Sequence, residues 1–314
     1  MIAFAVRRLL GMIAVLFAVS VLTFLIFNVI PNGDPAIRMA GKTPTVTQVA
    51  AIRRDWGFNK SLPVQYVDMM KHVFSGDLIS YTTRENVLDR IKQGLPATLF
   101  LAAGAAILML LGGIALGTLS ALRPNSFLDR VINGFAVVGI SLPVLVLGAF
   151  ASYYLGSKAG IFPSGGYVPI SQGVGQWAWH LLLPCIVLAV LFIGVYSRVL
   201  RGDLVDALRS DHVRTARAKG VPERQVLIKH ALRTSLIPTI SLWGLDVALL
   251  LGGGAVLTET VFDLHGVGEY FADSIRTLDV PPVMAITLFG AALIVIFNTV
   301  IDIVYALLDP RIRL

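Results

Sequence analysis

The sequence predicts an all-α membrane protein with six transmembrane helices, because its composition is strongly apolar and its apolar residues fall in six long segments. Of the 314 residues, 56% are hydrophobic and 14% are charged, and the mean hydropathy is +0.77. Soluble domains carry about 45–50% apolar and about 25% charged residues. The same composition excludes a disordered chain, which needs low hydrophobicity. We therefore expect residues 1–314 to form one membrane-embedded domain.

Each predicted span is long enough to cross a bilayer, which takes about 20 apolar residues in a helix. The six segments are Leu9–Ile30, Leu95–Leu122, Val131–Leu155, Leu181–Leu200, Leu236–Leu257 and Val283–Leu308. The first follows two arginines, as a signal peptide would, but its apolar run exceeds the about 7–15 residues of a signal sequence. No small-residue cleavage site ends it, so we expect an uncleaved span.

The distribution of Lys and Arg between the spans predicts the orientation of the chain, because cytoplasmic loops carry the excess of positive charge. The N-terminal stub, the 122–130 loop, the 198–235 segment and the C-terminal tail together carry fifteen, and loops 156–180 and 258–282 carry two. Both termini are therefore expected in the cytoplasm. The net charge of +7 reflects this asymmetry, and we expect no nucleic-acid partner.

Segment 31–94 is the exception, since it carries nine Lys/Arg and six acids yet must lie outside the cytoplasm. Segments longer than about 60 residues escape the charge rule. The segment also contains Trp56, Tyr66 and Phe74, which a small fold can bury. We predict a folded extracytoplasmic element between spans one and two.

Charged residues within the spans are scarce, and such residues are costly enough to be candidates for function. Asp246 lies halfway along the fifth span and Asp302 in the last third of the sixth. Asp246 is a candidate for the translocation path or for gating; the alternatives are that it caps a helix break or bonds to a neighbouring helix. For Asp302 we expect a structural role. Pro143, which can kink the third span, is the second path candidate.

No catalytic, metal or cofactor site is expected in this chain. The single cysteine, Cys185, lies in an apolar run, and the five histidines lack metal-ligand spacing. Gly41-Lys42-Thr43 imitates the end of a phosphate-binding loop, but Ala36 stands where its first glycine belongs. Ser164 has no paired histidine and does not lie in a nucleophile elbow. The sequence thus predicts a protein that is not an enzyme and does not itself hydrolyse ATP.

The 198–235 segment, between spans four and five, contains the most informative pattern. Asp211 is a suitable N-cap and Gly220 a suitable C-terminal stop for a short helix, and Pro222 suits the first turn of a second helix. We expect two short helices joined at a glycine corner in the cytoplasm. The alternative is a basic loop that only binds anionic lipid.

The stretch Val213–Gly220, with Pro238 downstream, resembles the cytoplasmic coupling motif of binding-protein-dependent ABC transporter permeases. It is closest to the dipeptide/oligopeptide/nickel branch, in its first permease subunit type. Arg214 replaces the glutamate of the general consensus, and the distance from Gly220 to Pro238 is longer than the common spacing. Both departures are usual in the peptide branch.

The resemblance covers nearly the whole chain. Ile79-Ser80 departs from it, since the family usually has a glycine after Leu78, and this leaves the local turn open. The further matching segments are Arg7–Leu10, Pro31–Pro35, Leu62–Tyr66, Gly76–Leu78, Phe162–Tyr167, Leu183-Pro184, Glu259–Phe262, Gly266–Gly268 and Asp309–Arg313.

The resemblance implies a bacterial inner-membrane permease that forms half of a heterodimeric pathway with a second, homologous permease. It further implies two cytoplasmic ATPase subunits that bind ATP and Mg²⁺, and an extracytoplasmic binding protein that delivers di- or oligopeptides. A coupling helix, mapped to Asp211–Lys219, would dock on an ATPase. The coupling residues implied are Asp211, Arg214, Thr215, Ala216, Arg217, Lys219 and Gly220.

Three alternatives remain open at this point. The first is a stand-alone secondary carrier or channel that works without ATPase partners, and the second is an intramembrane enzyme. The third is the same importer class with a different substrate, such as a nickel chelate, glutathione or a sugar. The loop 258–282 carries five acids and is a candidate docking surface for the binding protein.

Overall fold

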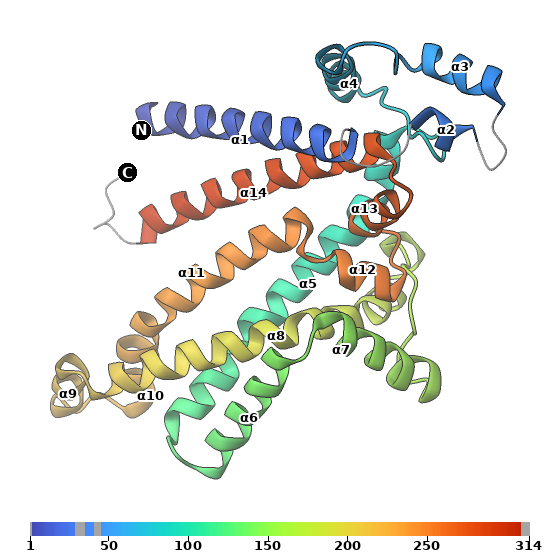
Figure 1. The fold of residues 1–314 in the computed structure, drawn as a ribbon. Coiled ribbons are helices and arrows are strands. Elements are labelled where there is room, and N and C mark those ends of the chain that lie inside the picture. The colour runs from blue at the N-terminus through green and yellow to red at the C-terminus, as the bar shows by residue number, and fades with distance from the viewer. Residues whose placement is uncertain (1, 29–34, 41–44, 309–314) are drawn as a thin grey trace. The chain divides into compact units, whose positions relative to one another are not determined.

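The computed structural model describes residues 2–28, 35–40 and 45–308, and within these the chain is helical, without β-sheet (Figure 1). An isolated bridge between Ile79 and Asn86 is the one β-type pairing in that part of the chain. The all-α membrane fold expected from the sequence is confirmed. The segments Pro31–Pro35 and Asp309–Arg313, singled out from the sequence, fall wholly or largely outside the described residues.

The chain forms two compact units, each described here by itself, with the boundary inside helix α5. The first unit comprises residues 1–96 and 266–314. Its helices are α1 (Ile2–Asn28), α2 (Pro35–Met39), α3 (Val46–Asp55), α4 (Leu62–Ser75), the start of α5 (Val87–Leu122), α13 (Val267–Arg276) and α14 (Val280–Leu308). Within this unit α1 and α14 lie side by side (Figure 1).

The second unit comprises residues 97–265. After the remainder of α5, its helices are α6 (Phe127–Ser141), α7 (Val144–Ala151), the π-helix η1 (Ser152–Lys158), the 3₁₀ turn η2 (Ile170–Gln172), α8 (Val174–Arg209), α9 (Asp211–Ala218), α10 (Glu223–Gln225), the π-helix η3 (Val226–Leu232), α11 (Arg233–Leu249), the π-helix η4 (Leu250–Gly254) and α12 (Val256–Phe262).

Five helices of the described chain are long and apolar enough to span a membrane, and a bent pair supplies a sixth. The five are Leu10–Asn28, Val87–Leu122, Val174–Arg209, Glu223–Gly254 and Val280–Ile301. The third predicted span, Val131–Leu155, departs from a single helix: α6 and α7 with η1 meet at 103°. Pro143 causes the break, because it disfavours helical geometry at the preceding residue, and Leu142 is extended (φ −88°, ψ 124°).

Glycines let α5 and α8 approach closely inside the second unit. A Cβ atom on Gly113 would lie 2.5 Å from the Cβ of Tyr196, and one on Gly117 would lie 2.9 Å from the carbonyl oxygen of Ser197. Neither position has room for a side chain without a shift of the neighbouring helix. These glycines therefore serve helix packing, as small residues commonly do between membrane helices.

The extracytoplasmic element predicted at 31–94 is folded where the structure describes it. The ring of Trp56 packs edge-on against Tyr81 at 5.1 Å, and Tyr66 packs against Phe24 at 5.4 Å. The Tyr66 hydroxyl also lies 2.6 Å from that of Ser20. The expectation that Phe74 is buried is wrong, since its side chain is 84% exposed.

Ser80 closes the turn that the sequence left open. Its hydroxyl donates to the carboxylate of Asp279 and accepts from the backbone N–H of Thr83 at 2.9 Å. The Asp279 carboxylate also accepts from the backbone N–H groups of Tyr81 and Thr82, at 2.9 and 3.2 Å. Burial, together with the charge of Asp279, raises the pKa of Tyr81. A serine is used here because its hydroxyl ties the turn to the residue that precedes α14.

We expect Asp279→Ala to lower the free energy of unfolding by about 2–4 kcal/mol, because it removes the acceptor of three donors on consecutive residues, one of them buried and two partly buried. The measurement is thermal unfolding in detergent. Asp273→Ala, in an exposed residue of α13, is the matched control and should change stability by less than about 0.5 kcal/mol. Equal effects from both changes would contradict this account of the turn.

Candidate functional site

The predicted coupling helix exists as α9, with small differences at its ends. Its N-cap is Ser210, in extended conformation, and Asp211 is the first helical residue, so the assignment of Asp211 as N-cap is wrong. The Thr215 hydroxyl donates to the Asp211 carbonyl oxygen at 2.9 Å. The helix ends at Ala218, with Lys219 as its C-cap.

An apolar cluster holds α9 against the second unit. Val213 and Ala216 are the buried residues of this helix, at 0% and 7% exposure, and they lie three positions apart, on one face. They pack with a cluster that includes Leu204 of α8 and Val226 and Ala231 of η3. Ala216 therefore packs α9 against its own chain and does not present a surface to a partner. The other predicted coupling residues, Asp211, Arg214, Thr215, Arg217, Lys219 and Gly220, are exposed.

A complete Schellman motif forms the glycine corner. The N–H of Gly220 donates to the carbonyl of Arg217 at 2.9 Å, and the N–H of Val221 donates to the carbonyl of Ala216 at 3.2 Å. Gly220 has a φ of +76°, which favours glycine because other residues pay about 1–2 kcal/mol there. The predicted stop at Gly220 is confirmed.

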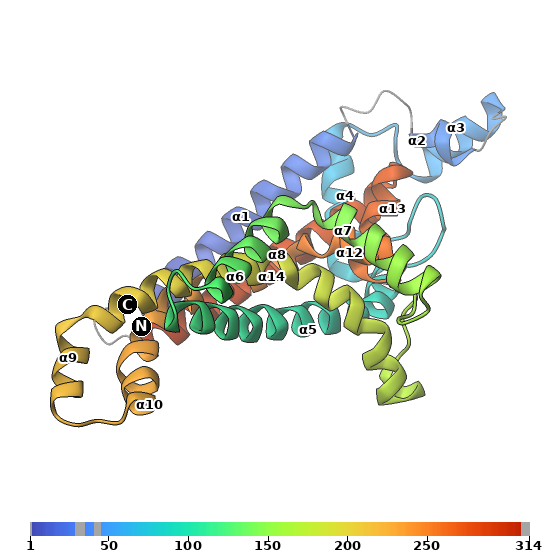
Figure 2. The same cartoon turned by 90° about the horizontal axis from the view of Figure 1, so that it is seen from below.

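The second helix of the corner differs from the prediction of two short helices. Pro222 is its N-cap, not a residue of its first turn, and the helix continues from α10 through η3 and α11 as one 32-residue stretch, Glu223–Gly254. Figure 2 shows α9 and α10 as the two arms of the corner. The arm after Gly220 is thus the start of the fifth span.

A bidentate ion pair joins the two arms. Arg217 donates from Nε and Nη2 to the two carboxylate oxygens of Glu223 at 2.8 and 3.2 Å, and from Nη1 to the Leu208 carbonyl at 3.4 Å. The hydrogen bond to Glu223 raises the pKa of Arg217, so its guanidinium stays charged. Arg217 therefore uses its Nε, Nη1 and Nη2 donors in hydrogen bonds within the chain. By contrast, the Arg214–Asp211 pair, at 3.4 Å, is 75% and 97% exposed, which leaves Arg214 available to a partner.

A buried carboxylate that sequence reasoning missed anchors the base of this assembly. Asp129, 3% exposed, accepts two hydrogen bonds of 2.7 Å from Arg201 of α8. It also accepts from the backbone N–H of Asn125 at 2.8 Å, from the Asn133 amide at 2.7 Å and from the Ser120 hydroxyl. One side chain thus ties together the end of α5, the 123–126 loop, α6 and α8. The available signal was an acid three residues after the capping Ser126.

The two translocation-path candidates are placed differently. Asp246 is half-buried in α11 and accepts a hydrogen bond of 2.7 Å from the Tyr196 hydroxyl of α8, which matches the alternative of a bond to a neighbouring helix. Pro143 is exposed at the break between α6 and α7. The structure does not bring these two residues into contact. The side chain of Asp302 lies outside the described residues.

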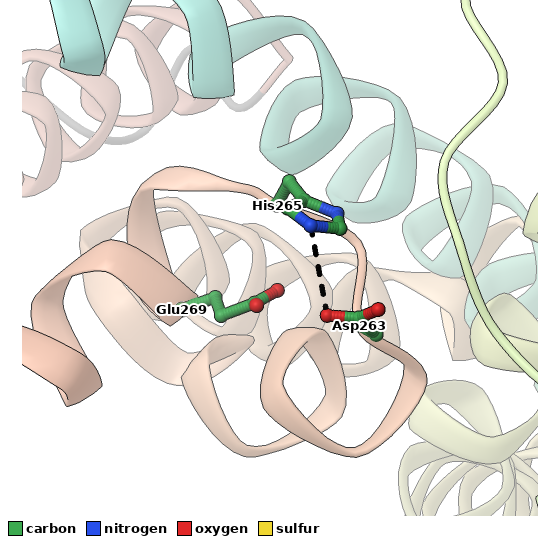
Figure 3. A group of neighbouring side chains, drawn as sticks. All are labelled: Asp263, His265 and Glu269. Carbon is green, nitrogen blue, oxygen red and sulfur yellow. Dashed lines mark ion pairs between the residues drawn. The ribbon is translucent and has the colours of Figure 1, made fainter.

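The acidic loop 258–282 is less acidic at its surface than its sequence suggests. Glu259 and Asp279 are buried, at 0% and 3% exposure, so two of its five acids face the protein interior. Asp263 pairs with His265 at 3.7 Å after α12 (Figure 3). Glu269, also labelled there, belongs to α13 of the other unit. Exposed acidic groups of this kind are common without a bound ion.

Comparison with known protein families decides the class of the chain. Residues 113–314 match the model of the binding-protein-dependent transport system inner membrane component, and residues 1–102 match that of its N-terminal part. The chain belongs to this permease family. It is therefore a membrane transport permease of the ABC importer class.

Relatives match this permease over almost its full length. It is 37% identical over 311 residues to a probable peptide ABC transporter permease, y4tP, of Sinorhizobium fredii, covering 99% of both chains. It is 37% identical to a probable D,D-dipeptide transport system permease, DdpB, of Escherichia coli K12, covering 98% of this chain and 96% of the relative. It is 35% identical to the glutathione transport system permease GsiC of Salmonella choleraesuis, covering 100% and 99%.

The permease should tolerate inversion of the corner ion pair better than its loss. Arg217→Glu places two carboxylates together and should increase the rate of limited proteolysis at the 208–225 corner. Adding Glu223→Arg restores an attractive pair and should bring the rate back towards that of the wild type. Because both side chains are largely exposed, the effect on global stability should stay below about 1 kcal/mol.

The control for this comparison is the reversal of the exposed pair, Asp211→Arg with Arg214→Glu, which should leave proteolysis at the corner unchanged. If the variant with both Arg217→Glu and Glu223→Arg were proteolysed as fast as Arg217→Glu alone, the ion pair would not be what closes the corner.

Removing one partner of the buried pair should be far more costly. We expect Asp129→Asn to destabilise the permease by about 3 kcal/mol, because it leaves the Arg201 charge without a counter-ion. Arg201→Lys should cost less, since lysine keeps the charge but loses the bidentate geometry. Thermal unfolding in detergent measures both, and Asp206→Asn, in an exposed residue of α8, is the control. An Asp129→Asn protein as stable as the wild type would refute the anchoring role.

Proposed function

We propose that this permease forms one half of the transmembrane pathway of an ATP-driven importer of short peptides. A second, homologous permease completes the pathway, two cytoplasmic ATPase subunits drive it, and an extracytoplasmic binding protein delivers the substrate. The observation that carries the substrate class is that the three relatives described above are named for peptide, D,D-dipeptide and glutathione transport. The first two names are those of peptide permeases, and glutathione is itself a tripeptide, which favours peptides over nickel chelates and sugars.

In this proposal the exposed face of α9 docks on an ATPase. Arg214 and Lys219 are the candidate contacts because both are exposed. Arg214 belongs to α9 and Lys219 is its C-cap, and the buried face of this helix is held by Val213 and Ala216. The helix is joined directly to α8 at one end and, through the Gly220 corner, to the fifth span at the other. A displacement of α9 would therefore move two spans together. Switching also requires that the ATPase contact differ between the two states of the pathway.

The remaining coupling residues hold α9 in place in this proposal. Ala216 seats the helix, Gly220 turns the chain, and Arg217 closes the corner on Glu223. Asp211 and Thr215 stabilise the first turn. Within the membrane, Asp246 fixes α11 to α8 through Tyr196, and the break at Pro143 supplies a joint between α6 and α7. In this proposal, Asp246 and Pro143 therefore position the helices that line the pathway and do not themselves bind the substrate.

ATP and Mg²⁺ are assigned to the ATPase subunits, and this chain is proposed to hold no cofactor. The segment that imitates a phosphate-binding loop, residues 41–44, lies outside the described residues. The whole chain, 1–314, acts as one permease domain in the inner membrane. Its termini lie in the cytoplasm with the 198–235 coupling segment, and the 31–94 insertion lies outside.

The proposal is tested by co-expressing the permease with its partner genes and measuring ATP hydrolysis by the complex in lipid vesicles. Binding protein loaded with a dipeptide should stimulate hydrolysis. Arg214→Glu with Lys219→Glu should reduce that stimulation at least about fivefold while the complex still assembles, because two exposed contacts are reversed. Arg123→Glu, an exposed change in another loop assigned to the cytoplasm, is the matched control.

The outcomes separate the alternatives. Stimulation by a nickel chelate or a sugar, and by neither dipeptides nor glutathione, would keep the importer class and replace the substrate. Substrate uptake into vesicles by the permease alone, without ATP, would overturn the importer proposal in favour of a secondary carrier. Unchanged stimulation in the Arg214/Lys219 variant would remove α9 as the docking surface.

A further inference from the structure

A long apolar groove lies open on the first compact unit, outside the coupling segment. Its volume is about 990 Å³. It is lined by residues 13–20 of α1, 66–76 of α4 and its C-cap, 87–95 of α5, and 285–292 of α14. Within each helix the lining positions recur at spacings of three or four residues, so each helix contributes a single face.

Two lysines are the only charged residues among those lining the groove in the described chain, Lys71 of α4 and Lys92 of α5. Both are exposed, and Lys92 lies 3.4 Å from the carboxylate of Asp89, a pair that is largely solvated. On α4, Lys71 shares a stripe with Val67 and Phe74, which are 47% and 84% exposed. A lysine flanked by exposed apolar side chains on a short helix is typical of a membrane interface.

The depth of the groove fits one leaflet of a bilayer. At 1.5 Å per residue, Lys92 lies about 8 Å, and Leu95 about 12 Å, from the start of α5, and Ala292 lies about 18 Å from the start of α14. One leaflet contributes about 15 Å of hydrocarbon. Lys92 therefore lies near the extracytoplasmic end of α5 in the proposed orientation, Lys71 lines the same groove from α4, and the apolar lining continues inward along α5 and α14.

We propose that this groove binds an anionic phospholipid of the outer leaflet, with an acyl chain along the four helix faces and the phosphate between Lys71 and Lys92. The charge pattern selects this occupant. An apolar helix of a second permease would leave two ammonium groups facing hydrocarbon, at a high desolvation cost, whereas a lipid phosphate neutralises them. The apolar lining below the lysines contacts the acyl chain, and burying these two apolar surfaces against each other is favourable.

The assembled transporter, in phosphatidylcholine vesicles containing a phosphatidylglycerol with a photoactivatable group on its acyl chain, provides the test. Cross-linked peptides should map to 88–95 of α5 and 285–292 of α14. Because lysines near a membrane surface attract anionic lipid, Lys71→Glu with Lys92→Glu should reduce this labelling about fivefold or more. Lys71→Arg with Lys92→Arg should retain it.

Two further variants guard against misfolding and general charge effects. Lys158→Glu makes the same charge change at an exposed residue of the second unit and should leave labelling unchanged. Ala292→Phe fills the inner end of the groove without touching the lysines and should also reduce labelling, whereas Ala291→Phe, at a residue that does not line the groove, should not.

Equal labelling by a photoactivatable phosphatidylcholine, or labelling that survives both the double Glu variant and Ala292→Phe, would overturn the proposal. Labelling of the permease alone that disappears in the assembled transporter would also overturn it, because a protein surface would then cover the groove. Substrate-stimulated ATP hydrolysis, measured on the same vesicles, reports separately on the proposed transport function.

Discussion

The buried carboxylate of Asp129 is the interaction on which the second unit depends. A charge removed from water is tolerated only when its lone pairs are satisfied, and here five donors from α5, α6, α8 and the loop between α5 and α6 converge on one side chain. Arg201 lies near the end of α8, which continues past Ser210 into α9. The anchor therefore fixes the helix from which the coupling segment projects.

The same unit is rigid at this anchor and jointed elsewhere. The Schellman corner at Gly220, the Arg217–Glu223 pair and the apolar seat of Val213 and Ala216 hold α9 at a defined angle to its neighbours. Joints occur at Pro143 and at Gly253, where φ is +129°. In the proposed mechanism, these contacts connect α9 to α8 and to the helix that begins at Glu223.

Much of this fold was predictable from the sequence, since long apolar runs can be satisfied only as helices in a membrane. The stop at Gly220 was predictable because glycine adopts a positive φ at the lowest cost. The Asp129–Arg201 pair was not, since its partners lie 72 residues apart and the capping pattern at Ser126 marks a helix start without indicating a partner on α8. The burial of Ala216 and the exposure of Phe74 depend on packing across segments, which a linear pattern does not report. The length of the helix that starts at Glu223 was not predicted. Its polar start and its apolar continuation differ in composition, and the π-helix η3 joins them into one stretch.

The central claim is that α9 presents one face to an ATPase and the other to its own permease. Cysteine cross-linking in the assembled transporter, with Cys185 replaced by alanine, tests it most directly. Cysteines at the exposed positions of Arg214 and Ala218 should cross-link to the ATPase, and cysteines at buried Val213 and at Arg123 of the 123–126 loop should not. Cross-linking from position 213 as strong as that from 214, or from position 123 alone, would contradict it.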